Sequence, residues 1–504
     1  MTMNGKVTLI GAGPGDAGLL TIKGYEALKK AEVVIYDRLV GEDVLDLIPE
    51  NAEKIDAGKE SSNHTIPQDR INEILLEKAI DGKNTVRLKG GDCFLFGRGG
   101  EELELLEKNN IQYEVIPGIT SALSVPAYAG IPVTHRDFVS SVHIITGHQK
   151  KNEPVRIDFE SCVKCKGTLV FLMGVSNMKL IMDGLMQHGM REDMPCGVIE
   201  QGTRPQQRKV IATVNTIVEE CKKAEIKSPA IIIVGEVCSL SNRFDWFSNL
   251  PLKGKEIIVT RPKERQGVLS DKLKALGAHV IQCPCIETDS IMDDSLFDNI
   301  IKKLGKCKWL AFTSPAGVKS VMEFMKNKRL DGRLFAGVKI AVIGKATGEE
   351  LEKYGLYPDL MPKEYKGRKL GELLAATAEK GDRVLLLRAA KGSPEVLTEL
   401  SKAGIEYEDI PVYETVYNVN KEQADVIKSQ INAGKTDYIT FTSTSTVEAF
   451  VSAIDCDRSK FMAVCIGEKT MKAAQKCGMN TIVSSNATID DLIKCMIESN
   501  GYSV

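Results

Sequence analysis

Residues 13–18 have the spacing G-x-G-x-x-G, and they follow the short apolar run of residues 7–10. A glycine-rich loop at the end of a strand lets a ligand approach the backbone closely. In enzymes that bind nicotinamide dinucleotides, such a strand runs straight into a helix whose N-terminus faces the pyrophosphate. Asp37 lies about one βα unit later, where those enzymes place an acidic residue on a ribose hydroxyl.

The surroundings of this loop fit a phosphate poorly. The helical pattern starts only near Leu20 or Thr21, so the loop is too long for a strand that turns directly into a helix. Pro14 has no amide hydrogen to donate, and Asp16 places a negative charge where phosphates would lie. A cationic ligand such as a sulfonium cofactor suits the loop better, which leaves a nicotinamide-dependent dehydrogenase as a weak alternative.

A second glycine cluster, Gly90-Gly91-Asp92, follows the strand-like residues 85–89. Two glycines would bring a ligand against the main chain, and Asp92 could then bind a ribose hydroxyl or a positive charge. The other interpretation is an ordinary turn in which Asp92 caps the following segment. Taken alone, the motif favours the turn.

The composition is that of an ordinary globular protein, with 504 residues of which 43% are hydrophobic and 27% charged. This length predicts two to four domains. With a net charge of -2, the chain lacks the excess of basic residues that is typical of nucleic-acid-binding proteins. The apolar runs are far too short to cross a membrane. The first residues lack the pattern of a secretion signal, and 13 cysteines then indicate free thiols in a reducing compartment, so we expect a cytoplasmic protein.

Two close cysteine pairs, Cys162/Cys165 and Cys283/Cys285, could suggest a zinc site. Neither pair has a second pair or suitably spaced histidines nearby. Buried or incidental thiols explain them better, so we predict no metal site.

Strand-like and helix-like patterns alternate along the whole chain, which predicts an α/β fold. The periodicity breaks at residues 242–254, and the second half then contains an internal repeat. Its two copies begin near Lys253 and Lys380, and the triplet Phe-Thr-Ser occurs in both, at 312–314 and 441–443. A third match joins residues 338–355 to residues 461–478. Three matching blocks in the same order predict two similar α/β lobes around a cleft.

Five segments of the first half together resemble uroporphyrinogen-III C-methyltransferase over about residues 5–245. They stand in the family's order: VTLIGAGPGDAGLLTIKGYEALKKAEVVIYDRLV, RLKGGDCFLFGRGGEE, VIPGITSALSVPAYAGIPVTHR, TLVFLMG and SPAIIIVGEV. GAGPGD alone would indicate only the wider tetrapyrrole-methylase class. The resemblance implies a two-lobed α/β fold that binds S-adenosylmethionine between its lobes. It also implies two successive methylations that convert uroporphyrinogen III to precorrin-2.

The same resemblance implies particular site residues. The proton acceptor falls on Asp37 and the proton donor on Lys59, although a strand-end cap and a solvated lysine are the other interpretations. Cys93 stands where the family usually has a proline after the two glycines and the aspartate. The cofactor contacts are expected at Pro14, Gly90, Gly91, Asp92, Leu95, Thr120, Ser121, Met173 and Gly202.

The second half, about residues 254–504, resembles uroporphyrinogen-III synthase. The residues that support this are IIVTRP at the start, FTS in both repeats, LLLR ending at Arg388 and VYET at 412–415. The resemblance implies two parallel-sheet lobes joined by extended connectors near 286–292 and 414–420. It also implies a cyclisation of hydroxymethylbilane that needs no cofactor and inverts the last ring. The product of this half would be the substrate of the other half.

Tyr413 is the residue we expect to assist departure of the substrate hydroxyl, with a packed tyrosine as the other interpretation. Further substrate contacts are expected at strand ends, where ligands of open α/β sheets collect, although these residues could instead cap helices: Thr260, Arg261, Thr313, Ser314, Thr442 and Ser443. Both substrates carry many carboxylates, so we expect Arg98, Arg136 and Arg261 to anchor them.

The two resemblances together imply a bifunctional enzyme that feeds sirohaem and cobalamin synthesis. The predicted parts are a methyltransferase at 1–245 with lobes 1–116 and 117–245, a linker at 246–253, and a synthase at 254–504 with lobes 254–288 plus 417–504 and 289–416. We expect a homodimer formed through the first half, and separate proteins for the dehydrogenase and chelatase steps. The alternative for the second half is a two-lobed binding domain without catalytic activity.

Overall fold

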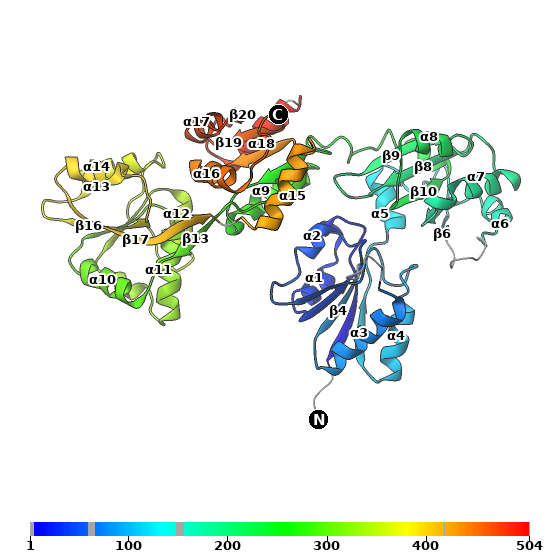
Figure 1. Ribbon diagram of the computed structural model, residues 1–504, viewed down its shortest axis with the longest axis horizontal. Helices are drawn as coiled ribbons and strands as arrows, with labels where there is room; N and C mark the ends of the chain where they lie inside the picture. Colours follow the sequence, from blue (N-terminus) through cyan, green and yellow to red (C-terminus); the bar gives the residue numbers. More distant parts are fainter. Residues whose placement is uncertain (1–4, 59–65, 148–155, 418, 503–504) are drawn as a thin grey trace. The chain divides into compact units, whose positions relative to one another are not determined.

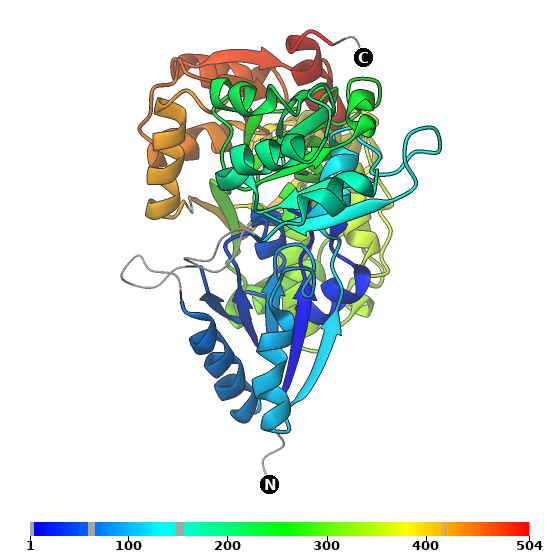
Figure 2. The same cartoon turned by 90° about the vertical axis from the view of Figure 1, so that its right-hand side faces the viewer.

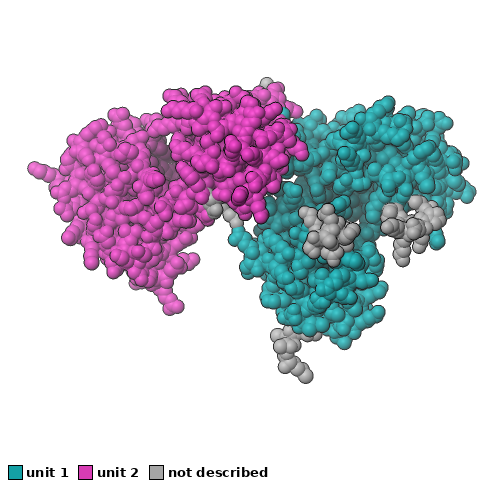
Figure 3. Space-filling model, in the orientation of Figure 1, with its two compact units in different colours: residues 1–255, 273–279 teal, residues 256–272, 280–504 magenta. Residues whose placement is uncertain are grey.

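The computed structural model describes residues 5–58, 66–147, 156–417 and 419–502. The chain divides into two compact units, which Figure 3 draws in different colours. Unit 1 comprises residues 1–255 and 273–279, and unit 2 comprises residues 256–272 and 280–504. Each unit contains two five-stranded sheets. The domain limits that we derived from the sequence stay a prediction.

The first sheet of unit 1, drawn in shades of blue in Figure 1, is parallel throughout. Its strand order is β3-β2-β4-β1-β5. Its strands are β1 (Lys6–Gly11), β2 (Val33–Tyr36), β3 (Glu53–Asp56), β4 (Thr85–Lys89) and β5 (Gln112–Ile116). Its helices are α1 (Ile22–Leu28), α2 (Glu42–Leu45), α3 (Gln68–Ile80) and α4 (Gly99–Lys108). Ile10 packs with Leu28 of α1, whereas Leu9 packs with Leu75 of α3 and Leu106 of α4. α3 and α4 are the two blue helices nearest the N mark in Figure 2. Both faces of the sheet are therefore covered, which explains why its strands are continuous apolar runs.

The second sheet of unit 1 is mixed and has the order β6-β7-β10-β8-β9. Only β6 and β7 are parallel, because β10 runs antiparallel to both β7 and β8, and β8 runs antiparallel to β9. The strands are β6 (Val142–Thr146), β7 (Thr168–Leu172), β8 (Pro195–Glu200), β9 (Arg208–Thr213) and β10 (Ala230–Val234). The helices are α5 (Ser121–Tyr128), α6 (Phe159–Lys164), α7 (Met178–Gln187) and α8 (Ile217–Lys223).

The first sheet of unit 2 combines the beginning and the end of this half of the chain, in the order β12-β11-β18-β19-β20. Its strands are β11 (Glu256–Val259), β12 (His279–Gln282), β18 (Tyr438–Phe441), β19 (Met462–Cys465) and β20 (Asn480–Val483). From β11 to β20 the neighbouring strands are parallel. The helices are α9 (Lys263–Ala275), α15 (Lys421–Asn432), α16 (Thr444–Ala453), α17 (Glu468–Lys476) and α18 (Ile489–Ser499).

The second sheet of unit 2 has the order β13-β17-β16-β14-β15. Its strands are β13 (Ile286–Ser290), β14 (Trp309–Phe312), β15 (Lys339–Val342), β16 (Arg383–Ala389) and β17 (Glu406–Tyr417). Its helices are α10 (Asp294–Leu304), α11 (Pro315–Asn327), α12 (Lys345–Glu352), α13 (Gly367–Thr377) and α14 (Glu395–Lys402). β13 pairs antiparallel with the end of β17, from Ile286 opposite Tyr417 to Ser290 opposite Tyr413. The two stretches expected to connect the lobes are therefore hydrogen-bonded to each other.

Short 3-10 turns complete the structure: η1 (Ala17–Leu19), η2 (Val175–Asn177), η3 (Glu236–Leu240) and η4 (Gly332–Phe335). Among the described residues, no helix combines the length and the apolar composition needed to span a membrane.

Candidate active sites

The first glycine loop is long, as its sequence predicted. β1 ends at Gly11, and α1 begins at Ile22 after the N-cap Thr21. The loop between them meets the second glycine cluster directly: the amide of Gly13 donates to the carbonyl oxygen of Gly91 over 3.1 Å, and the amide of Gly91 donates back over 2.7 Å. Gly13 and Gly91 have φ angles of 76° and 70°, which favour glycine. The two motifs therefore form one continuous surface of backbone.

Asp92 ties this surface to a third loop. Its Oδ1 accepts hydrogen bonds from the amides of Phe94 (2.9 Å) and Leu95 (3.0 Å), and its Oδ2 accepts one from the amide of Gly118 (3.1 Å). This is the cap that we kept as the structural interpretation of Asp92. The following Cys93 is only 1% exposed, and burial raises the pKa of its thiol to about 12.

A cavity of about 380 Å³ lies against both glycine motifs. It is lined by six of the predicted cofactor contacts: Pro14, Gly90, Gly91, Ser121, Met173 and Gly202. The other three, Asp92, Leu95 and Thr120, are not among its lining residues. Leu95 packs against the buried cluster that includes Val125 of α5 and Val170 of β7. Thr120 is the N-cap of α5, where its Oγ1 accepts the amide of Ala122 over 3.3 Å.

The cavity has further lining residues that were not among the predicted cofactor contacts. They are Gly13, Arg38, Leu39, Val125, Leu172, Ile199, Gln201, Arg204, Ser228, Pro229, Ala230 and Ile231. Arg204 connects two of the walls, because its Nη2 donates to the carbonyl oxygen of Leu39 over 2.9 Å. Met173 and Gln201 have left-handed φ angles of 56° and 51°, a strain that collects at functional sites but cannot be read from a sequence.

Asp37 lies beside this cavity, next to Arg38 in the chain, and is held by a buried ionic cluster. Nη2 of Arg87 donates to Oδ1 of Asp37, and Nζ of Lys89 lies 3.9 Å from Oδ2. Glu102 balances the two cations, since its Oε1 accepts from Nε of Arg87 (3.0 Å) and from Nζ of Lys89 (2.7 Å). Arg87, Lys89 and Glu102 are between 0% and 3% exposed, so the cluster fixes the Asp37 carboxylate in position.

The remaining site residues predicted for the first half are Lys59, Arg98 and Arg136. Lys59, the expected proton donor, lies outside the described residues. Arg98 has a left-handed φ of 59° and pairs with Glu101 through its Nη2 over 2.5 Å. Arg136 is exposed in the turn between His135 and Val139. Neither arginine lines the cavity.

In unit 2, the predicted residues of the first sheet lie at the carboxyl ends of β11 and β18. Thr260 is fully buried, and its Oγ1 donates to the carbonyl oxygen of Thr440 over 2.7 Å. Ser443 caps α16 and forms a capping box with Thr446. Thr442 and Arg261 are half-buried at the same edge. Ser443 therefore acts as a helix cap, which was the other interpretation of this residue. Thr260 joins β11 to β18 through its hydrogen bond to Thr440.

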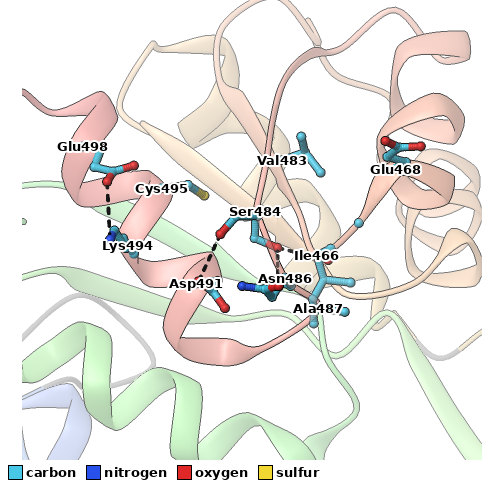
Figure 4. A pocket seen from close by; sticks show the side chains of 12 residues that line it. Ile466, Glu468, Val483, Ser484, Asn486, Ala487, Asp491, Lys494, Cys495 and Glu498 are labelled. Carbon is cyan, nitrogen blue, oxygen red and sulfur yellow. Dashed lines mark hydrogen bonds and ion pairs between the residues drawn. The ribbon is translucent and has the colours of Figure 1, made fainter. Parts of the chain in front are cut away.

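A second cavity, of about 630 Å³, opens at the same edge, beyond β19 and β20 (Figure 4). It is lined by residues 466–468, residues 483–487, Asp491, Lys494, Cys495 and Glu498. The charged side chains among these are three carboxylates and one lysine. A substrate that carries many carboxylates would be repelled here, so we do not assign the substrate to this cavity.

The second sheet of unit 2 brings Ser314 and Tyr413 together. Ser314 follows β14 and caps α11, because its Oγ accepts the amide of Gly317 over 3.1 Å. The same Oγ donates to the Tyr413 hydroxyl over 2.8 Å. Tyr413 is 8% exposed, and Thr313 is half-buried beside Ser314.

The close cysteine pairs are free thiols. The sulfurs of Cys283 and Cys285 are 3.7 Å apart and fully buried, and Cys162 and Cys165 are half-buried. In the part of the chain that the structure describes, no three His, Cys, Asp or Glu side chains are placed to hold a metal ion.

Comparison with known proteins assigns both halves. Residues 6–218 match the family model described as Tetrapyrrole (Corrin/Porphyrin) Methylases, and residues 267–494 match the model described as Uroporphyrinogen-III synthase HemD. A porphyrin biosynthesis protein HemD from Ruminiclostridium josui is 45% identical over 502 residues, which are 99% of each chain. A uroporphyrinogen-III C-methyltransferase from Bacillus subtilis is 40% identical over 354 residues, or 70% of this chain and 72% of that protein. A crystal structure of uroporphyrin-III C-methyl transferase from Thermus thermophilus with S-adenyl homocysteine is 38% identical, covers 47% of this chain and 99% of its own, and has a TM-score of 0.41.

These matches define a two-part protein, in which a tetrapyrrole methylase precedes a uroporphyrinogen-III synthase. Both resemblances that we inferred from the sequence are thereby confirmed, in the predicted order. The chain belongs to the family of the porphyrin biosynthesis protein HemD.

Proposed function

We propose that the chain carries out two consecutive reactions of tetrapyrrole synthesis. Unit 2 closes hydroxymethylbilane to uroporphyrinogen III with inversion of the last ring, and unit 1 methylates that product twice to give precorrin-2. The two family matches and the relative that spans the whole chain support both activities. The observation that carries the methyltransferase activity is the cavity where the two glycine motifs meet.

The cavity suits S-adenosylmethionine. A Cβ added to Gly91 would have only the amide nitrogen of Ser121 near it, at 4.0 Å, so a side chain here would extend into the cavity that Gly91 lines. The wall is mainly backbone and apolar side chains such as Ile199 and Leu172, with few polar groups to fix the orientation, as is usual for small-molecule sites. Bound there, the cofactor supplies an electrophilic methyl group to a pyrrole carbon of the macrocycle.

Side chains of the protein then accept and donate the protons that the reaction requires. Asp37 accepts the proton that the macrocycle loses after methyl transfer, and Arg87 and Lys89 hold its carboxylate in place for this. Lys59 is the donor that the family resemblance implies. Arg98 and Arg136 bind substrate carboxylates, since both are exposed enough to reach a large anionic ligand.

For the synthase reaction, we propose that Tyr413 donates its phenolic proton to the departing hydroxyl. Because Ser314 donates to the Tyr413 oxygen, the tyrosine's own proton can point elsewhere. Loss of the hydroxyl leaves an electrophilic azafulvene, which closes through a spiro intermediate. The protein contributes mainly by shaping the open chain, so no nucleophile is required. The proposed substrate contacts at the strand ends are Arg261, Thr313, Ser314, Thr442 and Ser443. Thr260, the remaining predicted contact, is fully buried and would support them by joining β11 to β18.

The remaining proposals concern the protein in the cell. The product feeds sirohaem and cobalamin synthesis, and separate proteins perform the dehydrogenase and chelatase steps. We propose a cytoplasmic homodimer that associates through unit 1.

The methyltransferase activity is tested by adding uroporphyrinogen III and S-adenosylmethionine to the purified full chain without oxygen. The proposal expects a product heavier by two methyl groups. A variant with Ser121→Phe, which fills the cavity, should lose this activity but keep the synthase reaction. An unmethylated substrate with the wild-type chain would contradict the proposal.

A further inference from the structure

Residues 241–253, which we call the clasp segment, belong to unit 1 and are anchored on the rest of that unit. Nζ of Lys209 lies 2.8 Å from Oδ2 of Asp245, and both side chains are 15% exposed. The same Nζ donates to Oγ of Ser241 over 2.8 Å, and this hydroxyl donates to the carbonyl oxygen of Ala129 over 2.7 Å. Most of the clasp segment was expected to be a linker, yet it makes directed contacts with the methylase unit.

Two aromatic side chains of the clasp segment also pack against Tyr128 of α5. The rings of Trp246 and Phe247 each lie 4.9 Å from the ring of Tyr128, centroid to centroid. Nε1 of Trp246 donates to the carbonyl oxygen of Ala127 over 3.1 Å. Phe247 is 6% exposed, so the contact with Tyr128 is packed rather than incidental.

Tyr128, which contacts the clasp segment, also forms a hydrogen bond to the first glycine loop. Its hydroxyl donates to Oδ2 of Asp16 over 2.7 Å, while Oδ1 of Asp16 accepts the amide of Gly18 over 2.7 Å. The amide of Asp16 donates to Oγ1 of Thr203 over 3.3 Å. Asp16 thus joins the loop that contains Pro14 to the loop that contains Thr203, and both loops line the cavity.

Lys253, near the other end of the clasp segment, holds the second of these loops. Its Nζ donates to the carbonyl oxygens of Arg204 (3.2 Å) and Pro205, and lies 4.4 Å above the ring of Phe247. Arg204 lines the cavity and reaches across it to Leu39. Lys253 therefore acts on the cavity wall through Arg204.

The loop of residues 201–205 requires such support. Gln201 and Thr203 are left-handed, with φ angles of 51° and 65°. Residues other than glycine keep this conformation only when their surroundings fix it. Within this region the amide of Thr203 donates to Oε1 of Gln207 (2.8 Å), and the amide of Gln201 donates to the carbonyl oxygen of Pro229 (3.0 Å). The bonds from Asp16 to Thr203 and from Lys253 to Arg204 and Pro205 add two further attachments that help to fix the loop.

We infer that Tyr128 and Lys253 are positioning residues for the methyl donor, holding in place the two loops between which it binds. This inference rests on the proposal that the cavity binds S-adenosylmethionine. Neither side chain lines the cavity, so neither is expected to touch the cofactor or the reacting atoms.

The test is isothermal titration of S-adenosylhomocysteine into the full chain and into three variants. Lys253→Met keeps the apolar stem over Phe247 but removes both hydrogen bonds. Tyr128→Phe keeps the ring contacts and removes only the bond to Asp16. Lys223→Met is the matched control, because Lys223 is an exposed lysine of unit 1 that pairs only locally with Glu220. Since hydrogen bonds to charged groups are being removed, we expect Kd to rise about fivefold to tenfold in the first two variants and to stay unchanged in the third.

The kinetic constants separate positioning from a general loss of stability. The inference expects KM for S-adenosylmethionine to rise in both variants while kcat stays close to that of the wild type. If the wild-type chain does not bind S-adenosylhomocysteine, the proposed function fails. If the wild type binds it and both variants bind equally well, the inference alone is overturned, even where their melting temperatures fall. Tyr128→Phe removes a single oxygen atom, so it decides the matter if Lys253→Met does not fold.

Discussion

Oγ of Ser314 donates a hydrogen bond to the Tyr413 hydroxyl over 2.8 Å and so joins two residues that are 99 positions apart. Ser314 stands at the carboxyl end of β14, and Tyr413 lies on the long strand β17. The serine also accepts the amide of Gly317 at the start of α11, which fixes its orientation. This leaves the phenolic proton of Tyr413 as the one that can be given to a substrate.

Tyr413→Phe is therefore expected to slow the conversion of hydroxymethylbilane to uroporphyrinogen III by about a hundredfold, as for loss of a general acid. Ser314→Ala should cost less, about tenfold or below, because the tyrosine stays in place. Initial rates measured by isomer analysis of the oxidised products check both values. Tyr417→Phe is the control, since Tyr417 lies on the same strand and is 55% exposed. Equal rates for Tyr413→Phe and the wild type would assign Tyr413 to packing alone.

Asp37→Asn is expected to reduce methyl transfer by about two orders of magnitude while binding of S-adenosylhomocysteine is unchanged. Asparagine can still accept from Arg87, so the ionic cluster around Glu102 stays assembled. Single-turnover methylation and isothermal titration separate the two effects. Asp81→Asn, at the exposed end of α3, is the control. Wild-type turnover in Asp37→Asn would leave the residue only a structural role.

Asp92→Ala is expected to weaken binding of the cofactor and to lower the melting temperature together. Its carboxylate accepts three backbone amides from two loops, and a hydrogen bond to a charged group contributes about 1.5–3 kcal/mol. The loss would release Gly118 from the backbone surface that includes Gly91. Titration calorimetry and thermal unfolding measure the two quantities. Wild-type affinity in Asp92→Ala would contradict the expectation that Asp92 contributes to cofactor binding.

Lys253 predicts a dependence of stability on pH. Burial lowers the pKa of its ammonium group from 10.5 to about 8, opposed by the nearby carboxylate of Asp245. The unfolded chain therefore binds a proton that the folded chain lacks between about pH 8 and 10.5. The cost of burying the charge is full below pH 8 and is relieved as the pH rises through this range.

The wild type should accordingly gain thermal stability relative to Lys253→Met when the pH is raised from 7 to 10. The comparison with Lys253→Met cancels the titration of other groups. Melting temperatures of the two proteins across this range check the prediction. A difference that stays constant with pH would mean that Lys253 keeps its proton in the folded chain.

Much of the fold could be predicted because local patterns decide it. The end of β1 followed from the apolar run of residues 7–10, and the late start of α1 followed from the helical pattern that begins near Leu20 or Thr21. The antiparallel pairing of β13 with β17 could not be predicted, because the residues of one strand do not indicate which distant strand it will pair with. The strand directions in the mixed second sheet of unit 1 could not be predicted for the same reason.

The cavity was only partly predictable. Gly90, Gly91 and Met173 were expected from the motifs, but the hydrogen bonds between Gly13 and Gly91 join residues whose separation in sequence says nothing of contact. Arg204 was missed, since a lone arginine in a polar loop has no distinctive pattern. For Asp92, Ser314 and Ser443 the sequence left a cap and a ligand open, and the structure shows each of them capping backbone amides. A role in binding stays a prediction for all three.

The central claim is that one chain makes uroporphyrinogen III and then methylates it. The most direct measurement gives hydroxymethylbilane to the purified full chain without oxygen, with and without S-adenosylmethionine, and resolves the products by chromatography and mass. We predict uroporphyrinogen III when the cofactor is left out and a doubly methylated product when it is present. Formation of uroporphyrinogen I alone, the isomer that arises by spontaneous closure, would contradict the synthase assignment. Failure to methylate added uroporphyrinogen III would contradict the other half.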